Sequence, residues 1–538
     1  MEEKQMRQLI TYSRRIALFA LILLTLGVFA RNTETVHAAS SSKDVLRVGM
    51  EANYPPYNWT QQNDANGAVP IDGSDEFANG YDVQTAKIIG KKLGRKVVVV
   101  KTVWDGLLPS LTSGKIDLII AGMSPTPERR KSIDFSLPYR RTKMIAVVNK
   151  DGKFADATSV NDFKNAKFTA QLATFHYDLI NQLKGTIKEP AMKDFSAMRV
   201  ALQAGTIDGY VAEDAEGISI TKVNPNVKIV DLSGKGGFKV DPSEVQTAIG
   251  VKKGNPLLQK VNQIVADISP AQQEKMITKA VLDQPESAAK GNWFLNIWKQ
   301  YGGMLLRGTG MTLFISLIAT IIGFVIGLLI GIARTIPRPT TRGKRWALNV
   351  LNWVLSVYIE IFRGTPMMVQ AAVFYYGIAQ IFGLNLERTF AAIVIVSINT
   401  GAYLAEVVRG GIISTPTGQF EAASALGMTH FQRMRKIILP QAIRNSLPSI
   451  TNEFIVNIKD TSVLSIISVS ELFFTGSTIA GQNFQFFQTY LTISLIYLVL
   501  TFTITRIFRV IEKRLEGPTN YNLMANQLQV TTPTLEDN

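Results

Sequence analysis

The stretch that decides the fold is Glu421-Ala-Ala-Ser-Ala-Leu-Gly427, followed after nine further residues by Ile437-Ile-Leu-Pro440. It is a polar and charged segment set between strongly apolar parts of the chain. A segment of this kind predicts a loop between membrane-spanning helices, and its lysines and arginines predict that it faces the cytoplasm. We therefore expect a membrane protein with a specialised cytoplasmic loop.

Long apolar segments follow one another in the C-terminal part of the chain. From about residue 305 onward they are long enough to cross a bilayer as helices. We predict five spans, near 305–333, 347–382, 389–409, 450–470 and 488–508, the second with a loop or bend. Lysine and arginine gather after the first, third and last of these spans, whereas residues 471–488 contain neither. The positive-inside rule therefore places both long basic loops and the C-terminus in the cytoplasm.

The composition excludes several kinds of chemistry. A net charge of +15 over 538 residues could suggest nucleic-acid binding, but many of the cations lie in the loops that flank the spans. We therefore expect no nucleic-acid partner. Because the chain contains no cysteine, disulfides, thiolate nucleophiles, cysteine metal ligands and a lipid-modified cysteine are excluded.

The N-terminus has the pattern of a segment that directs export. Four basic residues up to Arg15 precede an apolar run from Ile16 to Ala30, and Val36-His37-Ala38 is a small-residue cleavage pattern. We expect a signal peptide or an uncleaved membrane anchor, so that the residues after about 40 lie outside the cytoplasm. Five spans with a cytoplasmic C-terminus predict the same topology.

Between the export segment and the spans, the chain has the pattern of a water-soluble α/β domain. Short apolar strands, such as Val45–Met50, Val97–Val100 and Gly209–Val211, alternate with helical segments. We predict an export segment over residues 1–42, an extracellular domain over 43–285, a linker over 286–300, a transmembrane domain over 301–515 and a cytoplasmic tail over 516–538.

Two polar patterns and one glycine pattern mark the predicted spans. Gly323, Gly327 and Gly331 lie on one helical face, which predicts close packing of another helix, within one subunit rather than between two. Asn399, Tyr403 and Glu406 share a face of the third span, and Glu453, Asn457 and Asp460 repeat this spacing in the fourth. Polar groups at such depth face the bundle interior or water. They could line a transport route or form hydrogen bonds between helices, and the sequence does not separate these two roles.

The spacing of the 421–440 stretch resembles the EAA loop of ABC importer permeases. Ile361-Phe-Arg-Gly-Thr-Pro366 and Lys459-Asp-Thr-Ser-Val463 resemble motifs of the polar amino acid branch of that family, and the resemblance covers nearly all of residues 300–515. It implies that Glu421, Ala422, Ala423 and Gly427 belong to coupling helices that bind a separate ATPase. No G-x-x-x-x-G-K-[ST] sequence occurs in the chain, so it has no phosphate-binding loop of its own. We expect no cofactor in this chain, and the family's paired permeases imply a homodimer as the simplest assembly.

The soluble region resembles the extracytoplasmic amino-acid-binding proteins. The motifs that carry the resemblance are Gly49–Tyr57, Gly80–Val83, Trp104–Pro109, Asp117–Arg129 and Gly205–Glu213. The resemblance implies two α/β lobes that close on a ligand about a hinge. The fold class that we expect is therefore an α/β bilobal periplasmic-binding-protein-like domain followed by an all-α five-helix permease domain.

An amino acid is a zwitterion, so its site needs cationic donors for the carboxylate and an anion for the ammonium group. Arg129 can bind a carboxylate with two parallel hydrogen bonds, and the Gly122-Met123-Ser124 turn can add backbone donors. By resemblance, Glu213 holds the ammonium group, with the adjacent Asp214 as an alternative. Tyr54 and Trp104 match, by resemblance, the aromatic pair that encloses the ligand side chain, and Glu51 faces its far end.

The sequence departs from the family at Ala173-Thr174-Phe175, where Gly-Thr-Thr is common. Thr174 is retained as a candidate ligand for the carboxylate, but Phe175 cannot donate a side-chain hydrogen bond. Glu51 would repel an acidic ligand, so we expect a cationic or an amide side chain.

Two other functions use a domain of this kind. An amino-acid-gated channel would have its pore segment inside the binding domain, whereas here the whole domain precedes the spans. An enzyme would have to use Glu51, Glu213 or Asp214 as its acid or base, and no nucleophile or metal cluster accompanies them. We therefore expect an amino acid importer subunit and no catalytic residues.

Overall fold

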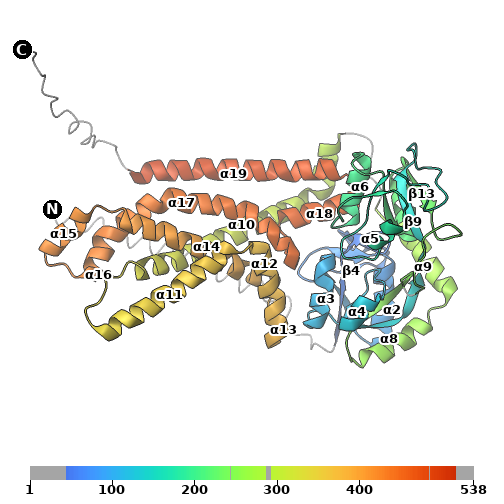
Figure 1. Ribbon diagram of the computed structural model, residues 1–538, viewed down its shortest axis with the longest axis horizontal. Coiled ribbons are helices and arrows are strands. Elements are labelled where there is room, and N and C mark those ends of the chain that lie inside the picture. Colours follow the sequence, from blue (N-terminus) through green and yellow to red (C-terminus); the bar gives the residue numbers. More distant parts are fainter. Residues whose placement is uncertain (1–43, 243, 286–291, 484, 517–538) are drawn as a thin grey trace, which may run out of the picture.

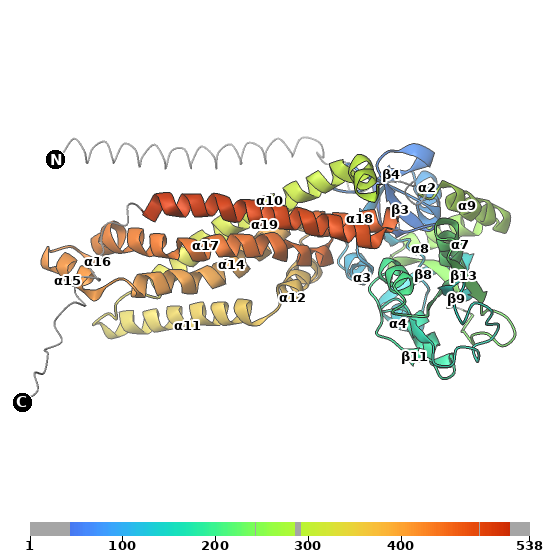
Figure 2. The ribbon, with the colours of Figure 1, turned by 90° about the horizontal axis from the view of Figure 1, so that it is seen from above.

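The computed structural model describes residues 44–242, 244–285, 292–483 and 485–516. The chain folds into an α/β body at one end and a long bundle of helices at the other (Figures 1 and 2). The short helices α15 (Thr417–Ala425) and α16 (His430–Arg433) lie at the tip of the bundle farthest from the α/β body. The expected export segment, residues 1–42, lies outside the described residues.

The α/β body has two lobes, and the first is built on a mixed sheet. Its strand order is β6 (Lys96–Lys101), β1 (Val45–Met50), β7 (Leu118–Ile119), β14 (Gln246–Lys252) and β8 (Ile133–Arg141). The strands β6, β1 and β7 are parallel, whereas β14 and β8 are antiparallel to their neighbours. A small second sheet has the order β2 (Asn53–Tyr54), β3 (Asn58–Gln61), β5 (Phe77–Asn79) and β4 (Val69–Pro70).

Helices cover the sheet of the first lobe, because packing against it buries their apolar faces. They are α2 (Tyr81–Leu93), α3 (Trp104–Thr112), α4 (Pro127–Ser132), α8 (Leu257–Ala266) and α9 (Pro270–Asp283). Alternation of buried strands with such helices is what the sequence predicts for an α/β domain. The core of this lobe includes fully buried Leu46, Val48 and Ile119.

The second lobe repeats this plan with its own core. Its sheet has the order β11 (Ile187–Lys188), β10 (Lys167–Thr169), β12 (Gly209–Glu213), β9 (Met144–Asn149) and β13 (Val227–Asp231). Its helices are α5 (His176–Leu179), α6 (Phe195–Gln203) and α7 (Asp214–Val223). The chain passes between the lobes twice, and the two crossings touch where the Thr142 amide donates to the Val245 carbonyl at 2.9 Å. These adjacent crossings form the hinge that the family resemblance implies.

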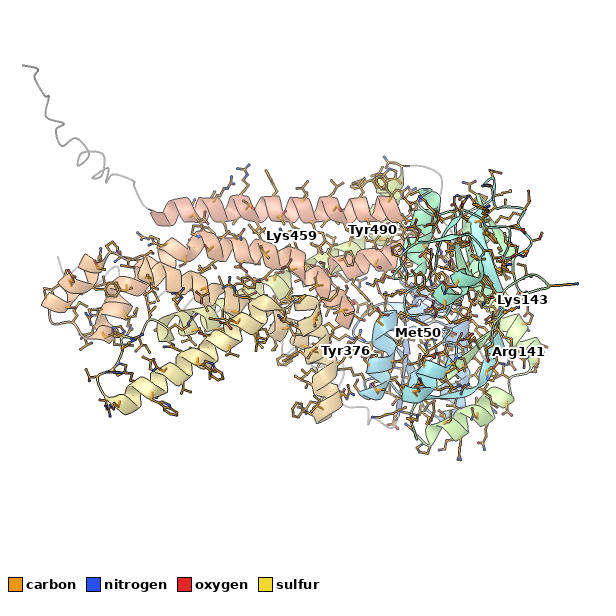
Figure 3. The ribbon with its side chains drawn as sticks, in the orientation of Figure 1. Met50, Arg141, Lys143, Tyr376, Lys459 and Tyr490 are labelled. Atoms are coloured by element: carbon orange, nitrogen blue, oxygen red, sulfur yellow. The ribbon has the colours of Figure 1, made fainter. Side chains whose placement is uncertain are left out.

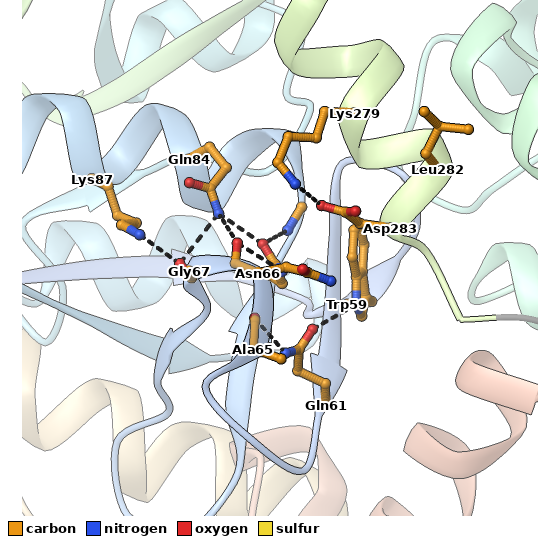
Figure 4. Close-up of polar contacts among 12 residues, drawn as sticks. Trp59, Gln61, Ala65, Asn66, Gly67, Gln84, Lys87, Lys279, Leu282 and Asp283 are labelled. Atoms are coloured by element: carbon orange, nitrogen blue, oxygen red, sulfur yellow. Dashed lines mark hydrogen bonds and ion pairs between the residues drawn. The ribbon is translucent and has the colours of Figure 1, made fainter.

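A short turn closes the outer edge of the first lobe (Figure 4). Asn66 and Gly67 both have positive φ, at 56° and 74°. The side chains of Gln84 and Lys87 on α2 donate to the Gly67 carbonyl at 3.2 and 2.7 Å. A hollow of about 610 Å³ opens beside this turn, between α2 and α9, and it is lined by apolar side chains and by Lys87, Lys91, Lys96 and Lys279. It lies away from the cleft between the lobes and contains none of the residues expected to bind the ligand.

The C-terminal body consists of helices, several of which are long and apolar. They are α10 (Trp293–Ala333), α11 (Arg342–Gly364), α12 (Met367–Ala372), α13 (Ile378–Phe382), α14 (Arg388–Ile413), α17 (Leu439–Asp460), α18 (Leu472–Asn483) and α19 (Phe486–Glu516). By length and composition, α10, α14 and α19 can each cross a membrane, and a bent pair around α17 and α18 could supply a fourth crossing. The sequence predicts a linker up to residue 300, but α10 already begins at Trp293, so the last part of that segment is helical.

Two of the expected spans are interrupted. The predicted span over 347–382 is divided at Thr365 and Pro366, where α11 ends and α12 begins. Proline lacks an amide hydrogen and disfavours helix in the residue before it, which explains this break. The predicted span over 450–470 ends with a tight 3₁₀ turn over Thr461–Ile467, after which the chain bends by 58° into α18. Ser468 has a φ of 58° at this bend, and Glu471 caps the new helix by accepting from the amides of Phe473 and Phe474.

The glycine face of α10 packs against α14, as expected for packing within one subunit. A Cβ atom at Gly323 would lie 2.8 Å from Thr400, and one at Gly331 would lie 2.8 Å from Val408. At Gly327, a Cβ would lie 2.8 Å from the Leu404 carbonyl carbon. The absence of side chains along this face therefore sets how closely the two helices approach.

We expect Gly327→Ala to destabilise the membrane domain by about 1–3 kcal/mol. The new methyl group would meet backbone atoms of α14, which cannot move without separating the helices. The thermal melting temperature of the purified full-length protein in detergent, followed by size-exclusion chromatography, measures the effect. Gly310→Ala on the same helix is the control, because a Cβ there has nothing within 4 Å. Equal melting temperatures for the two variants would contradict this packing.

The α/β body is docked on the ends of the helices mainly through its first lobe, and α6 of the second lobe also lies against α19. Arg388, at the start of α14, donates to the carbonyls of Lys101 at 2.8 Å and of Ser468 at 3.3 Å. Ser468 also accepts from the Val103 amide at 3.1 Å, and the ammonium group of Lys101 donates to the Thr478 hydroxyl at 2.5 Å. In Figure 3, Tyr376 and Tyr490 lie at this end of the bundle, whereas Arg141 and Lys143 lie on the far side of the α/β body.

Candidate functional site

With the exception of Met123, the residues expected to bind a ligand meet in a closed cleft between the two lobes. Its walls include Glu51, Tyr54, Trp104, Gly122, Ser124, Arg129, Gln171, Thr174, Phe175, His176, Phe195 and Glu213. The cavity that remains between them has a volume of about 20 Å³. That space holds about one water molecule, so an amino acid requires the lobes to open or the side chains to move apart.

Arg129 bridges the two lobes inside this cleft. It lies on the short helix α4, whose first turn is capped by the Thr126 hydroxyl. Its guanidinium group donates to the Ser124 carbonyl of the first lobe at 2.9 Å and to the Ala173 carbonyl of the second lobe at 3.1 Å. It also lies 5.1 Å from the centre of the Trp104 ring. Burial lowers the pKa of Arg129 to about 10, so the group remains charged and can exchange these carbonyls for a carboxylate.

The structure separates the three residues of the expected backbone turn. Ser124 lines the cleft, whereas Met123 is buried in the core and its carbonyl accepts from the Ala248 amide. The amide of Gly122 donates to the Tyr139 hydroxyl at 3.0 Å. In this closed form, the Gly122 amide therefore already has a hydrogen-bond acceptor within the protein.

The aromatic walls differ from the expected pair. Tyr54 and Trp104 both line the cleft, but the Tyr54 ring stacks on Phe195 of the second lobe, with centroids 4.6 Å apart and planes 3° apart. The face of Trp104 is occupied by Arg129. Phe195 was not among the residues expected from the sequence, because it lies outside the motifs and only folding of the second lobe places it opposite Tyr54.

A buried carboxylate forms the opposite wall. Glu213 ends strand β12, is only 2% exposed and accepts a hydrogen bond from the Tyr57 hydroxyl at 3.1 Å. Burial, and then the nearby Asp214, raise the pKa of Glu213 to about 8. Asp214 itself forms an ion pair with Arg140 at 2.9 Å. Glu213 is therefore the carboxylate available to an ammonium group, and Asp214 is already neutralised by the protein.

His176 also lines the cleft, although it belongs to none of the motifs from which ligand-binding residues were expected. It is 6% exposed, its Nε2 atom lies 3.8 Å from Glu213, and neither ring nitrogen has a hydrogen-bond partner among the described residues. Burial, with Arg129 nearby, lowers the pKa of His176 to about 3, which keeps the ring neutral. A neutral imidazole offers one donor and one acceptor, so it suits either charged end of an amino acid. The sequence feature that could have pointed to His176 is its position directly after Phe175, in the segment that departs from the family pattern.

Thr174 is placed in the cleft, but its hydroxyl donates to the Gln171 carbonyl at 2.6 Å. Glu51 lies at another end of the cleft, close to the side chain of Gln171. Burial, followed by the charges of Asp194 and Asp105, raises the pKa of Glu51 to about 8. The cleft thus has a guanidinium group, a carboxyl at the Glu213 wall and a second carboxyl at the Glu51 end.

We expect ligand affinity to rise with pH between about 6 and 8. Both Glu213 and Glu51 are protonated in the empty cleft below a pKa of about 8, and a cation binds the ionised forms. Each carboxyl that must ionise contributes up to about tenfold in affinity for each pH unit. Titration calorimetry at pH 6, 7 and 8 in buffers of different ionisation enthalpy measures the affinity and the protons released.

The stability of the ligand-free domain should change in the opposite direction. Because the folded-state pKa values lie above the ordinary value of 4.5, the folded state binds more protons, and stability falls as pH rises from about 4.5 to about 8. Glu213→Gln should weaken binding and reduce the pH dependence of the affinity. A parent protein whose affinity is constant from pH 6 to 8 would contradict this assignment of the two carboxyls.

Comparison with known proteins identifies both parts of the chain. Residues 46–281 match the family model of bacterial extracellular solute-binding proteins, family 3, and residues 343–517 match that of binding-protein-dependent transport system inner membrane components. The glutamine transport system permease protein of Escherichia coli (strain K12) is 38% identical over 214 residues, which cover 40% of this chain and 93% of that protein. This chain belongs to the amino acid ABC importer permeases. It carries a binding protein of family 3 in the same polypeptide, so the expectation of a fused subunit is confirmed.

Other similar proteins come from the same two groups. The L-cystine transport system permease protein of Bacillus subtilis (strain 168) is 41% identical over 167 residues, 31% of this chain and 71% of that protein. A solved ancestral arginine-binding protein bound to arginine is 34% identical, with a TM-score of 0.37. The matched region covers 44% of this chain and 97% of that protein. A solved amino acid ABC transporter substrate-binding protein from Streptococcus pneumoniae, bound to L-arginine, is 26% identical with a TM-score of 0.38, and covers 45% and 96%.

The polar residues of the permease helices mostly join helices to one another. Asn457 donates to the hydroxyls of Thr320 at 2.9 Å and Thr400 at 3.0 Å, and so ties three helices together. Glu406 forms ion pairs with Arg334 and Arg409.

Two further candidates for the transport route differ from each other. Asn399 donates to the Phe362 carbonyl at 3.0 Å and to the Gln370 side chain at 3.1 Å. Glu453 is half-buried, and within the described part of the chain its carboxylate forms no hydrogen bond or ion pair. Among the four predicted route residues, Glu453 is therefore the one whose carboxylate has no partner within the described part of the chain.

The EAA loop of the permease forms the tip of the bundle. Glu421, Ala422 and Ala423 lie on α15, and Gly427, with a φ of 72°, turns the chain toward α16. Arg433 holds the two helices together by donating to the Ser424 hydroxyl. Leu426 and Phe431 are 79% and 70% exposed.

Proposed function

We propose that the binding domain captures a polar amino acid with a cationic or an amide side chain and delivers it to its own permease domain. The observation that carries this proposal is the placement of Arg129, Glu213 and Glu51 around one closed cleft. A guanidinium group suits the ligand carboxylate, and a buried carboxylate suits its ammonium group. Glu51 then faces the side chain, where an acidic ligand would be repelled.

We propose that a separate ATPase binds the tip formed by α15 and α16. Leu426 and Phe431 expose apolar surface there, at the end of the bundle opposite the binding domain. This arrangement supports a cytoplasmic tip and C-terminus with the binding domain on the other side of the membrane. ATP hydrolysis by the partner would then switch the permease between outward and inward access, while this chain performs no catalysis.

We propose that the permease domain crosses the membrane five times and works as a homodimer. The paired segments α11 with α12–α13 and α17 with α18 would supply the two crossings that are interrupted. The bundle exposes large apolar side chains, including Trp346, Trp353 and Ile381, which supports contact with lipid or a second copy. In this arrangement, Glu453 would be the first residue to test as part of the transport route.

The proposal is tested by titrating the full-length protein in detergent with each of the twenty amino acids by calorimetry. Binding of one cationic or amide amino acid, followed by its ATP-dependent uptake into proteoliposomes with the partner ATPase, is the expected result. Tight binding of glutamate or aspartate would contradict the role of Glu51. Failure of all twenty to bind would overturn the amino acid assignment.

A further inference from the structure

Two cavities meet at the end of the ligand cleft that faces the permease. The first is the cleft itself, and the second, of about 50 Å³, lies where both lobes touch the membrane helices. Glu51 and Trp104 line both cavities. These two side chains therefore form the wall between the ligand cleft and the space beside the permease.

The ligand-binding groups are distributed unevenly with respect to this wall. Arg129 and Glu213 line the cleft but not the second cavity. A ligand held by its carboxylate at Arg129 and by its ammonium group at Glu213 would direct its side chain toward Glu51. The end of the cleft that accepts the side chain is thus the end that borders the permease.

The second cavity is shared by three parts of the protein. Asp105 comes from the first lobe, Asp194 comes from the second lobe, and Ser465, Ser477 and Thr478 come from the permease. We propose that the amino acid enters the permease with its side chain leading, by passing between Glu51 and Asp194 into this cavity. We name this second cavity, whose lining includes Asp105, Asp194, Ser465, Ser477 and Thr478, the portal. This inference rests on the proposed function, because it assumes an amino acid held between Arg129 and Glu213.

The anchoring of the binding domain explains how the portal would open. The first lobe is fixed to the permease by Lys101, Val103 and the rim ion pair between Asp75 and Arg307 at 2.8 Å. Gln171 and Asp194 belong to the second lobe, which is joined to the first through the hinge at Thr142 and Val245. When the second lobe rotates away from the anchored first lobe, the contact of Gln171 with Glu51 breaks, and the cleft becomes continuous with the portal.

Carboxyl groups outnumber ammonium groups in the lining of the portal by three to two. Glu51, Asp105 and Asp194 present carboxyl groups to a leading ammonium, guanidinium or amide group. Lys193 also lines the portal. The ammonium group of Lys101 is held by the hydroxyls of Thr60 at 3.0 Å and Thr478 at 2.5 Å, which keeps it in the interface.

The absence of cysteine allows a direct test of the portal. Ser477→Cys is introduced into the full-length protein, which is reconstituted in proteoliposomes with its ATPase and reacted with the small cationic thiol reagent MTSET. Binding and uptake of the unmodified variant serve as the reference. After complete modification, uptake should fall at least tenfold while the dissociation constant of the amino acid changes less than twofold, because the added group fills the portal and not the cleft.

The matched control is Asp64→Cys, which lies in an exposed loop of the first lobe and lines neither cavity. Its modification should leave uptake within twofold of the parent. Full uptake after complete modification at residue 477 would overturn the portal. A parent protein that neither binds nor imports an amino acid would instead overturn the proposed function, so the two failures are distinguishable.

The orientation of the ligand is tested by how well it protects the introduced thiol of the Ser477→Cys variant from modification. Saturating L-lysine should slow the modification more than saturating 2,3-diaminopropionate, because the longer side chain reaches farther toward the portal. If the titration selects an amide ligand, L-glutamine and L-asparagine replace this pair. Equal protection by the long and the short ligand would overturn delivery with the side chain leading.

Discussion

Arg129→Ala should reduce the affinity for the amino acid by about 30-fold to several thousand-fold, which corresponds to about 2–5 kcal/mol. The mutation removes the guanidinium group that can hold the ligand carboxylate with two hydrogen bonds. The ligand carboxylate would then be left unpaired in a closed cleft. It also removes the hydrogen bonds from Arg129 to Ser124 and Ala173, which join the lobes. Calorimetry on the full-length protein at pH 8 measures the loss.

Two variants make the Arg129 result specific. Arg130→Ala removes the neighbouring cation, which is exposed and donates to the Pro125 carbonyl outside the cleft, and it should leave the affinity within about twofold. Arg129→Lys keeps the charge but loses the paired geometry, so it should recover only part of the affinity. An affinity of Arg129→Ala close to that of the parent would show that the ligand carboxylate is held elsewhere, with His176 as the next residue to test.

Gly427→Val should reduce ATP-dependent uptake at least tenfold while the amino acid still binds with the affinity of the parent. Gly427 turns the chain between α15 and α16 with a φ of 72°, a conformation that a β-branched residue strongly disfavours. The strain should change how the two helices are presented to the ATPase, although a Cβ there meets nothing within 4 Å. Uptake into proteoliposomes and substrate-stimulated ATP hydrolysis are the two measurements.

Gly418→Ala is the control for this loop, because Gly418 lies on α15 in open space and does not have a positive φ. It should retain uptake close to that of the parent. If Gly427→Val also transports normally, the tip does not depend on this turn, and coupling would have to run through another contact. If it loses ligand binding as well, the effect is on folding and not on coupling.

Particular residues show how far the sequence could lead. Arg129, Glu213 and Glu51 are assigned by motifs in which each residue follows a short, recognisable local pattern, and folding brings all three to one cleft. His176 and Phe195 are not predictable in this way, because each reaches the cleft only when the second lobe closes on the first. Asp214 illustrates the reverse case: its sequence position suggests a ligand for ammonium, but Arg140 from the first lobe already neutralises it.

In the membrane part, too, some features are predictable from the sequence and others depend on the tertiary structure. The glycine face of α10 has a helical period that can be read from the chain, because it needs only one partner helix. The roles of Asn457 and Glu406 cannot be predicted from the sequence, because the same spacing suits a transport route and a contact between helices. The break at Ser468 depends on the packing of α18 under the binding domain, so hydropathy alone extends the helix through it.

The sequence by itself determined the fused architecture, the likeness to ABC importer permeases and the residue types of the binding cleft. These properties follow from local periodicity, apolar length and short motifs, which do not depend on distant contacts. Only the tertiary structure decided which charged groups stay available, because ion pairs such as Arg140 with Asp214 form between segments 74 residues apart. It also decided that the Glu51 end of the cleft borders the permease, since that depends on how one lobe is docked on helices far along the chain.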